Sequence, residues 1–243
     1  MLKSEKKLAM SGIKNDIKLS IITVNYNNAN GLKQTLESVN PKSNIEYEII
    51  IVDSRSTDGS LDIANLHSNY HKNFYIISEK DNGIYDGMNK GIINSKGHWV
   101  IFMNSGDAFY NFLEIDLLLS NENISVSYGN FISSQGTFKP YKTDYLKKGI
   151  IHACHQSMFF NYKILKENLF YNTKYKIYSD YDLVNRIFLL NFNFQYYDSI
   201  VARIELDGIS QKVSWQKRLD KFLIVFKSYG FKGIINSYIR KNE

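Results

Sequence analysis

The chain has 243 residues, enough for one large domain with a buried core, and its 44% hydrophobic and 22% charged residues are typical of a globular protein. Its one cysteine, Cys154, excludes a disulfide-built scaffold, and no apolar run reaches transmembrane length, so we expect a cytoplasmic protein. The formal net charge of +6 permits an anionic partner such as a nucleotide diphosphate or an acidic lipid surface, whereas the dispersed lysines do not form the basic and aromatic stripe of a nucleic-acid binder.

The first half of the chain alternates apolar runs with helical patterns. Residues 1–17 are expected to form a flexible leader, and Asn30 is a possible cap of the first helix. Four apolar runs that end in polar residues predict strands at 18–24, 47–52, 74–77 and 98–103. Strands separated by helices of this length imply parallel pairing through right-handed crossovers, and so an α/β sheet of the nucleotide-binding type.

The stretch from Asp81 to Asp107 combines a helix, a strand and a polar turn. Ile84, Met88 and Ile92 recur at helical spacing and predict one apolar helix face. The following strand ends in Asn104-Ser-Gly-Asp107, and ligands of open α/β sheets bind at the carboxyl ends of strands. A carboxylate beside a glycine at this place suits Mg²⁺ or Mn²⁺ holding a diphosphate, although a plain polar turn is the alternative.

The second half is less regular. Its apolar runs predict strands at 124–129 and 131–138, a short strand at 158–160, and late strands at 194–197 and 200–204. Helices are expected at 113–119, at 163–169 and from Asp180, where Leu183, Ile187 and Leu190 align on one face. Residues 211–243 mix lysine and arginine with large apolar residues, which predicts an amphipathic basic helical region that either docks on the domain or lies on an anionic membrane face.

Three carboxylates follow buried strands or begin a helix. Asp53 could accept hydrogen bonds from a nucleobase or a ribose, or it could serve a turn; Asp107 is the metal candidate. Asp180 could act as a general base on an acceptor hydroxyl, or it could be a helix cap, and Asp182 competes for that role. His152, Cys154 and His155 have a spacing that invites a zinc site, but no second pair of ligands lies nearby, so His155-Gln156 is better read as lining the donor or acceptor site.

Motifs in the order of one known family run through residues 18–186. They are Ser20-Ile-Ile-Thr-Val-Asn-Tyr-Asn27, Ile51-Val-Asp-Ser-Arg-Ser-Thr-Asp-Gly59, Asp81-Asn-Gly-Ile-Tyr-Asp-Gly-Met-Asn-Lys-Gly91, Phe102-Met-Asn-Ser-Gly-Asp107, His155-Gln-Ser-Met-Phe-Phe160 and Ser179-Asp-Tyr-Asp-Leu183. The set resembles family-2 glycosyltransferases of bacterial capsule, exopolysaccharide and lipopolysaccharide biosynthesis. Each motif alone is weak, and it is their common order that is specific.

The resemblance implies a GT-A fold, with a Rossmann-like, mostly parallel central sheet flanked by helices. The domain would span 18–210, divided into a nucleotide-sugar half, 18–107, and an acceptor half, 108–210. It further implies inverting transfer of a sugar from a nucleotide diphosphate to a hydroxyl of a glycan or a lipid-linked acceptor. Asp180 would be the base and Asp107 the metal ligand. The donor would be bound by Thr23, Asn25, Tyr26, Asp53, Asp86, Asn104, Ser105 and His155.

Three positions depart from the family pattern. Ser54 replaces a second Asp, Asn104 replaces the first acid of the metal motif, and Ser179 replaces the Glu before the base. These departures support the alternative of a catalytically degenerate domain that binds glycans or scaffolds an assembly complex. A sugar nucleotidyltransferase is less favoured, because the loop after the first strand, Asn25-Tyr-Asn-Asn28, has no glycine or basic residue to hold a triphosphate.

Overall fold

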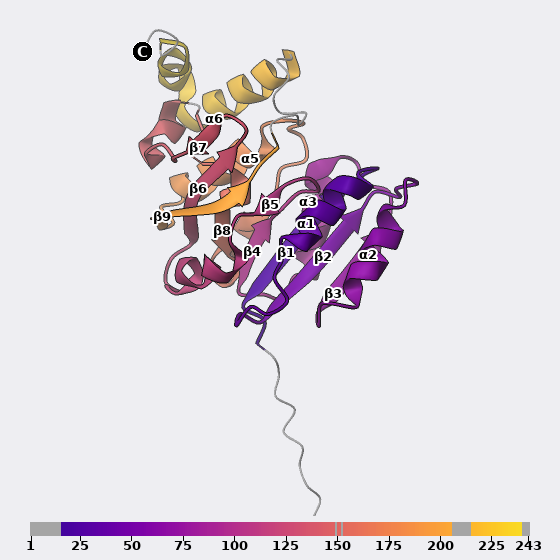
Figure 1. Cartoon of the computed structure of the whole chain (residues 1–243). Helices are drawn as coiled ribbons and strands as arrows, with labels where there is room; N and C mark the ends of the chain where they lie inside the picture. The colour runs from indigo at the N-terminus through magenta and orange to yellow at the C-terminus, as the bar shows by residue number, and fades with distance from the viewer. Residues whose placement is uncertain (1–15, 149, 152, 206–214, 240–243) are drawn as a thin grey trace, which may run out of the picture.

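A computed structural model describes residues 16–148, 150–151, 153–205 and 215–239 (Figure 1). The expected leader, 1–17, falls almost entirely outside these ranges. One sheet runs through the described chain in the order β3-β2-β1-β4-β8-β6-β9-β5, and β7 extends it beside β6. The predicted α/β class is therefore confirmed.

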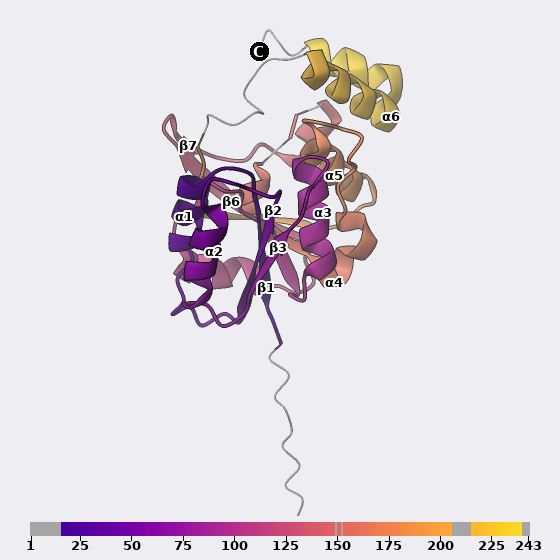
Figure 2. The same cartoon turned by 90° about the vertical axis from the view of Figure 1, so that its right-hand side faces the viewer.

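The parallel half of the sheet comes from the first half of the chain. Its strands are β1 (Leu19–Asn25), β2 (Tyr47–Asp53), β3 (Phe74–Ser78) and β4 (Trp99–Phe102), and they pair with one another in parallel. Every residue of β1 is buried, since helices cover both faces, and this explains its continuous apolar run. α1 (Ala29–Glu37) and α2 (Ser60–Ser68) cover one face, and α3 (Ile84–Asn94) covers the other (Figure 2).

Two details of these helices differ from the expectation. The cap of α1 is Asn28, whose side chain accepts from Gly31 N–H, and not Asn30. Ile84 is 44% exposed, and Tyr85 instead faces the core with Met88 and Ile92. Both shifts are of one or two residues, which is the usual uncertainty of a helix end read from spacing.

The mixed half of the sheet, in which β6 and β9 are parallel and the other pairs antiparallel, is built by the second half of the chain. β8 (Met158–Asn161) pairs with β4 and with β6 (Val126–Ser133), and β9 (Phe194–Arg203) lies between β6 and a short strand β5 (Ala108–Phe109) that the sequence did not reveal. β6 forms a hairpin with β7 (Gly136–Phe138).

The predicted breaks in this half are wrong, because polar and glycine residues lie inside strands. β6 continues through Gly129, where the pairing with β9 shifts register and an added Cβ would lie 2.5 Å from the Ser199 carbonyl oxygen. β9 continues through Asp198, which accepts from Asn130 Nδ2 at 2.8 Å on the neighbouring strand. The expected strand at 131–138 is therefore divided between the end of β6 and β7, and those at 194–197 and 200–204 are joined in β9.

Short helical turns connect the strands. The predicted helix at 113–119 is a 3₁₀ helix, η1 (Phe112–Leu119), and that at 163–169 is split into α4 (Tyr162–Leu165) and η4 (Lys166–Leu169). Lys166 has φ 45°, which breaks the helix. Two further 3₁₀ turns, η2 (Thr143–Lys148) and η3 (His155–Ser157), precede β8.

Two longer helices close the second half. α5 (Ser179–Leu189) buries Leu183 and Ile187, whereas Leu190, expected on the same face, lies beyond the helix and is 55% exposed. α6 (Trp215–Ile239) contains a kink at Gly230 and contributes Ile224 and Val225 to the core shared with α5. The helical pattern of the C-terminal region is thus confirmed for 215–239, and the proposed boundary at 210/211 lies outside the described residues.

Candidate active site

The carboxyl ends of β1 and β2 are joined by a buried polar contact. Asn25 donates from Nδ2 to Asp53 Oδ1 at 2.8 Å, and these residues are register partners of the parallel pair. Asp53 is fully buried and accepts also from Ser56 N–H at 2.8 Å, from Ser56 Oγ, and from Ser78 Oγ at 3.3 Å. In this structure Asp53 holds the turn after β2, and its contact with a nucleotide stays a prediction.

The other residues expected on the nucleotide side differ in exposure. Thr23, two residues before Asn25 on β1, is fully buried, and its hydroxyl has no hydrogen-bond partner among the described residues. Tyr26 is 66% exposed at the edge. Asp86 lies in the first turn of α3, accepts from Asn82 N–H at 3.0 Å and is 3.7 Å from Lys90 Nζ. The structure thus offers Tyr26 and Asp86 at the surface and keeps Thr23 in the core.

The loop Asn104 to Asp107 is held from below by α1. Thr35 Oγ1 donates to the Asp107 carbonyl oxygen at 2.6 Å and accepts from Gly106 N–H at 3.0 Å. Asn28 Nδ2 donates to the Ser105 carbonyl oxygen at 3.0 Å. Gly106 has φ +108°, a conformation that glycine adopts without strain, and a Cβ there would project toward Glu205 Oε2 at 3.6 Å. The loop is therefore a turn whose shape is held by Thr35 and Asn28.

Asp107 connects the loop to the second half of the chain. Gln156 Nε2 donates to its Oδ2 at 2.7 Å, and Glu205 N–H donates to its Oδ1 at 3.2 Å. Burial raises the pKa of the Asp107 carboxyl, while the hydrogen bond from Gln156 and the charge of His155 act in the opposite direction. Asp107 is thus a buried, oriented carboxylate whose charge is incompletely compensated by the protein.

His155 lies between the loop and the start of α5. Its Nε2 is 3.3 Å from Asn104 Nδ2, and its Nδ1 is 3.7 Å from Asp180 Oδ2. Asp182 does not share this place, because its carboxylate is buried and accepts from Arg186 Nε at 2.9 Å. The structure therefore brings Asp107, Asn104, His155 and Asp180 together and assigns Asp182 to the packing of α5.

The residues around Asp107 fit a divalent cation that a diphosphate would complete. One carboxylate is present, and Asn104 Oδ1 is a buried oxygen with no partner in the described part of the chain. Within that part, no group of three or more His, Cys, Asp or Glu side chains is placed to hold a metal ion. Mg²⁺ and Mn²⁺ accept hard oxygen ligands and are often held by one or two carboxylates, substrate phosphates and water. The donor set suits such a site.

The zinc reading of His152, Cys154 and His155 finds no support. His152 lies outside the described residues. Burial raises the pKa of the Cys154 thiol to about 12, so the thiolate that zinc needs is disfavoured at neutral pH.

Three residues at this site were not anticipated from the sequence. Thr35 and Glu205 are separated from Asp107 by long stretches of chain, and no local motif marks them. Arg55 is exposed at the end of β2, has φ 56° and makes no hydrogen bond or ion pair with the described residues. A large residue in a left-handed conformation is uncommon and often marks a functional site, but only the backbone angles reveal it.

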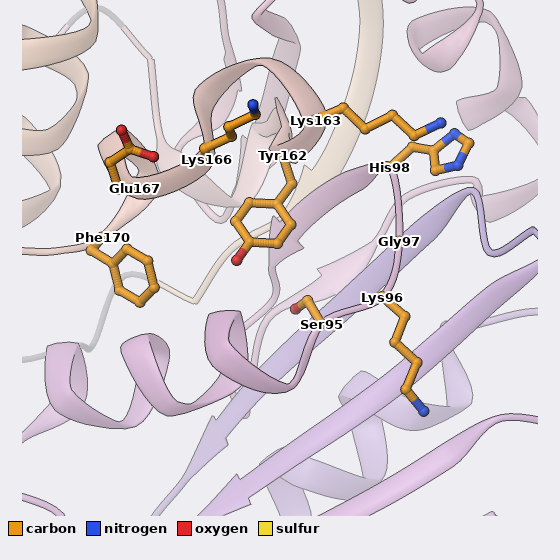
Figure 3. Close-up of a pocket in the computed structure, with 9 residues that line it drawn as sticks. All are labelled: Ser95, Lys96, Gly97, His98, Tyr162, Lys163, Lys166, Glu167 and Phe170. Carbon is orange, nitrogen blue, oxygen red and sulfur yellow. The ribbon is translucent and has the colours of Figure 1, made fainter.

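A separate cavity lies at the opposite end of β4. It measures about 510 Å³ and is lined on one side by Ser95 to His98 and on the other by Tyr162, Lys163, Lys166, Glu167 and Phe170 (Figure 3). None of the candidate site residues lines it. The site at Asp107 instead follows the carboxyl end of β4.

Comparisons with known proteins agree with this arrangement. The TarS 1-349 structure from S. aureus in complex with UDP-GlcNAc aligns with a TM-score of 0.70 at 15% identity, over 90% of this chain and 70% of that one. The mannosyltransferase PcManGT from Pyrobaculum calidifontis, in complex with GDP-Man and Mn²⁺, aligns with a TM-score of 0.63 at 12% identity, over 93% of this chain and 74% of that one. The fold is thus the GT-A fold of glycosyltransferases.

The sequence comparisons place the chain within one family. The model of glycosyl transferase family 2 matches residues 20–182. A PGL/p-HBAD biosynthesis glycosyltransferase of Mycobacterium tuberculosis is 31% identical over 182 residues, which cover 70% of this chain and 69% of that protein. TuaG of Bacillus subtilis, a putative teichuronic acid biosynthesis glycosyltransferase, is 32% identical over 92 residues, 37% of this chain and 36% of its own. The chain belongs to glycosyl transferase family 2 and is a glycosyltransferase.

Replacing Thr35 by Val tests how the loop is held. The variant keeps the side-chain shape but removes the hydroxyl beneath Asp107, so the free energy of unfolding is expected to fall by about 1–3 kcal/mol. Denaturant titration measures it. Thr23→Val is the matched control, because it removes a buried hydroxyl that has no partner among the described residues and should leave stability unchanged or higher. Equal losses in both variants would contradict the role of Thr35.

Proposed function

We propose that this glycosyltransferase moves a sugar, with inversion, from a nucleotide diphosphate donor to a hydroxyl of a glycan or lipid-linked acceptor in surface polysaccharide assembly. The observation that carries the proposal is the contact of His155 with both the Asn104 end of the 104–107 loop and Asp180. It puts a candidate diphosphate site and a candidate base at one edge. The complexes of TarS with UDP-GlcNAc and of PcManGT with GDP-Man and Mn²⁺ support the donor class.

In the proposed reaction Asp180 accepts the proton of the acceptor hydroxyl. The acceptor oxygen then forms a bond to the anomeric carbon of the sugar while the bond from that carbon to the diphosphate breaks on the opposite side. Asp107, held by Gln156 and Glu205 N–H, would hold the divalent cation at the diphosphate end of the donor. A divalent cation bound at Asp107 would supply the charge that stabilises the leaving diphosphate. Tyr26, Asn25, Asp53 and Asp86 would contact the nucleotide and sugar.

The acceptor and the place of the reaction are part of the same proposal. Two relatives are named for PGL/p-HBAD biosynthesis and for teichuronic acid biosynthesis, and these names support the proposal of a glycan or lipid-linked acceptor here. We place the reaction in the cytoplasm, with peripheral contact at the inner face of the membrane. No helix in residues 16–239, where described, is long and apolar enough to cross a membrane.

A second candidate is a degenerate domain that binds glycans without transferring sugar. Asn104 stands where an acid is expected, and Ser179, which replaces the expected Glu, is fully buried and donates to the Asn172 carbonyl oxygen at 2.9 Å. Ser179 thus supports the turn before α5 and supplies no charge to Asp180.

Calorimetric titration with UDP, GDP, dTDP and CDP, each with and without Mn²⁺, separates the two candidates. The transferase proposal expects one nucleotide to bind tightly and only with the metal, and its sugar conjugate to be hydrolysed slowly. Failure of all four to bind, together with no hydrolysis of any donor, would support the degenerate domain.

A further inference from the structure

The outer face of α6 carries a continuous apolar surface that nothing in the described structure covers. Trp215, Leu219, Phe222 and Phe226 recur at spacings of four, three and four residues, which places them on one side of the helix. They are 74%, 38%, 40% and 41% exposed, and Leu223 beside them is 43% exposed. We call these five residues, with Phe231 and Ile235, the α6 apolar face. Large exposed apolar patches mark interaction sites.

The kink in α6 extends this face. Gly230 has φ 62°, which turns the chain so that Phe231 packs edge-on against Phe226 with ring centroids 5.1 Å apart. Phe226 also stacks on Phe222 at 6.0 Å. Phe231 is nevertheless 75% exposed and Ile235 55% exposed. The three phenylalanine rings therefore form one preorganised cluster that faces outward across the kink.

The charges around the α6 apolar face have one sign. Arg218, Lys227 and Lys232 are exposed on α6, and Lys217 and Lys221 are half-buried. Asp220 is the only acidic residue between 215 and 239, and it is 1% exposed. An apolar stripe on a helix whose exposed charges are all cations matches an anionic lipid surface, where the rings enter the acyl boundary and the basic groups meet the headgroups. A protein partner would not require this one-sided charge.

α6 is fastened to the segment that leads into α5. Asp220 Oδ2 accepts from Lys176 N–H at 2.9 Å and from Ile177 N–H at 3.0 Å, three residues before Asp180. Tyr229 and Ser228 also hydrogen-bond to Asn185 of α5. Figures 1 and 2 both show α6 at the end of the molecule away from the start of β1. A surface that holds α6 therefore lies on the side of the molecule where the acceptor half carries Asp180.

We infer that the α6 apolar face and its flanking cations dock the enzyme on an anionic lipid surface, with the helix lying on the membrane. The inference deepens the peripheral contact of the proposed function and rests on it for its biological purpose. The docking itself is measured without donor or acceptor, so its outcome is separate from that of the transfer reaction.

The test is flotation of the full chain with vesicles of phosphatidylcholine alone or mixed with phosphatidylglycerol. We expect binding to the anionic vesicles only, and its loss in high salt. Phe222→Asp with Phe226→Asp should weaken binding at least about tenfold, because two apolar rings that enter the lipid would be replaced by charged carboxylates. Arg218→Glu with Lys227→Glu should weaken it by about tenfold or more. Substitution is used in place of deletion, since removing α6 would also remove Asp220 from the segment before Asp180.

Matched variants in α1 and α2 and in the turns that follow them are the controls. Leu66→Asp with Tyr70→Asp places the same charges on exposed apolar positions, and Lys33→Glu with Lys42→Glu makes the same change in net charge. Both pairs should float like the parent chain. The inference is overturned if the parent does not float with anionic vesicles, or if the α6 and control variants float alike. It is also overturned if no variant affects flotation while sedimentation shows that the α6 variants dissociate a dimer of the parent chain. That result would show that the α6 apolar face binds a second copy of the chain.

Discussion

Asp180→Asn is expected to lower the turnover of sugar transfer by about 10²–10⁴-fold, the usual contribution of a general base. The amide has almost the same shape as the carboxylate but does not accept the acceptor proton. Donor binding should change little, because no proton moves until the acceptor attacks. Steady-state kinetics with the donor that calorimetry identifies, together with the donor affinity of the variant, separates the two effects.

Asp182→Asn is the matched control two residues away. Asp182 is buried against Arg186, which also donates to the carbonyl oxygens of Asn168 and Phe170. The variant should therefore lower the free energy of unfolding by about 1–3 kcal/mol and leave the turnover of the folded protein within a few fold. A large loss of turnover in Asp182→Asn with a small one in Asp180→Asn would exchange the two roles and reject the assignment.

Asp107→Asn is expected to abolish most of the metal-dependent part of donor binding, a loss of at least about tenfold, since changes even in the partners of metal ligands commonly cost 10–100-fold. Calorimetric titration of the nucleotide diphosphate with and without Mn²⁺ measures this. Asp116→Asn, an exposed carboxylate on η1, is the control and should bind as the parent does. Unchanged manganese dependence in Asp107→Asn would remove Asp107 from the metal site.

The pH dependence of this binding follows from the burial of Asp107. Because its pKa in the folded protein is raised above the ordinary 3.8, the carboxylate that a cation needs is lost at a higher pH than for an exposed aspartate. Metal-dependent donor binding should therefore fall as the pH is lowered through that raised pKa, and Asp107→Asn should show no such step. Calorimetry of the metal-dependent donor binding across a series of pH values, in the parent and the variant, would show the step or its absence.

The stability of the metal-free protein should change with pH in the opposite direction and fall as the pH rises. Between pH 3.8 and the raised pKa, Asp107 has lost its proton in the unfolded chain but keeps it in the folded protein. This residue therefore lowers stability as the pH rises through that range, and it contributes no penalty below pH 3.8. Denaturant titration of the metal-free parent across this pH range checks the direction, with Asp107→Asn as the reference that lacks the step. A rise in the parent's stability relative to the variant over this range would contradict the burial of the ionised group.

Much of the first half of the fold was predictable because its signals are local. The runs of β1 and β2 are apolar throughout, since both faces of a central parallel strand are buried, and the spacing of Met88 and Ile92 defines the inner face of α3. The order of motifs also led to the right family, which the comparisons confirm. The polar ends of β2 and β4 marked the edge where Asp53 and Asp107 lie.

The rest of the fold and of the candidate site depended on contacts between distant parts of the chain. The sequence alone determined the α/β class and the candidate carboxylates at strand and helix ends, because strand ends and helix starts are set by neighbouring residues. The order of its motifs determined the resemblance to glycosyltransferases. Whether Gly129 and Asp198 break their strands depended on β6 and β9 lying side by side. The proposal of Asp180 rather than Asp182 as the base rests on which carboxylate lies near His155 and which contacts Arg186, and the support of Asp107 rests on Thr35 and Glu205. Apart from the Asp182–Arg186 pair, which lies within α5, these contacts join residues tens of positions apart. No local pattern encodes a hydrogen bond between elements that only the packed sheet brings together.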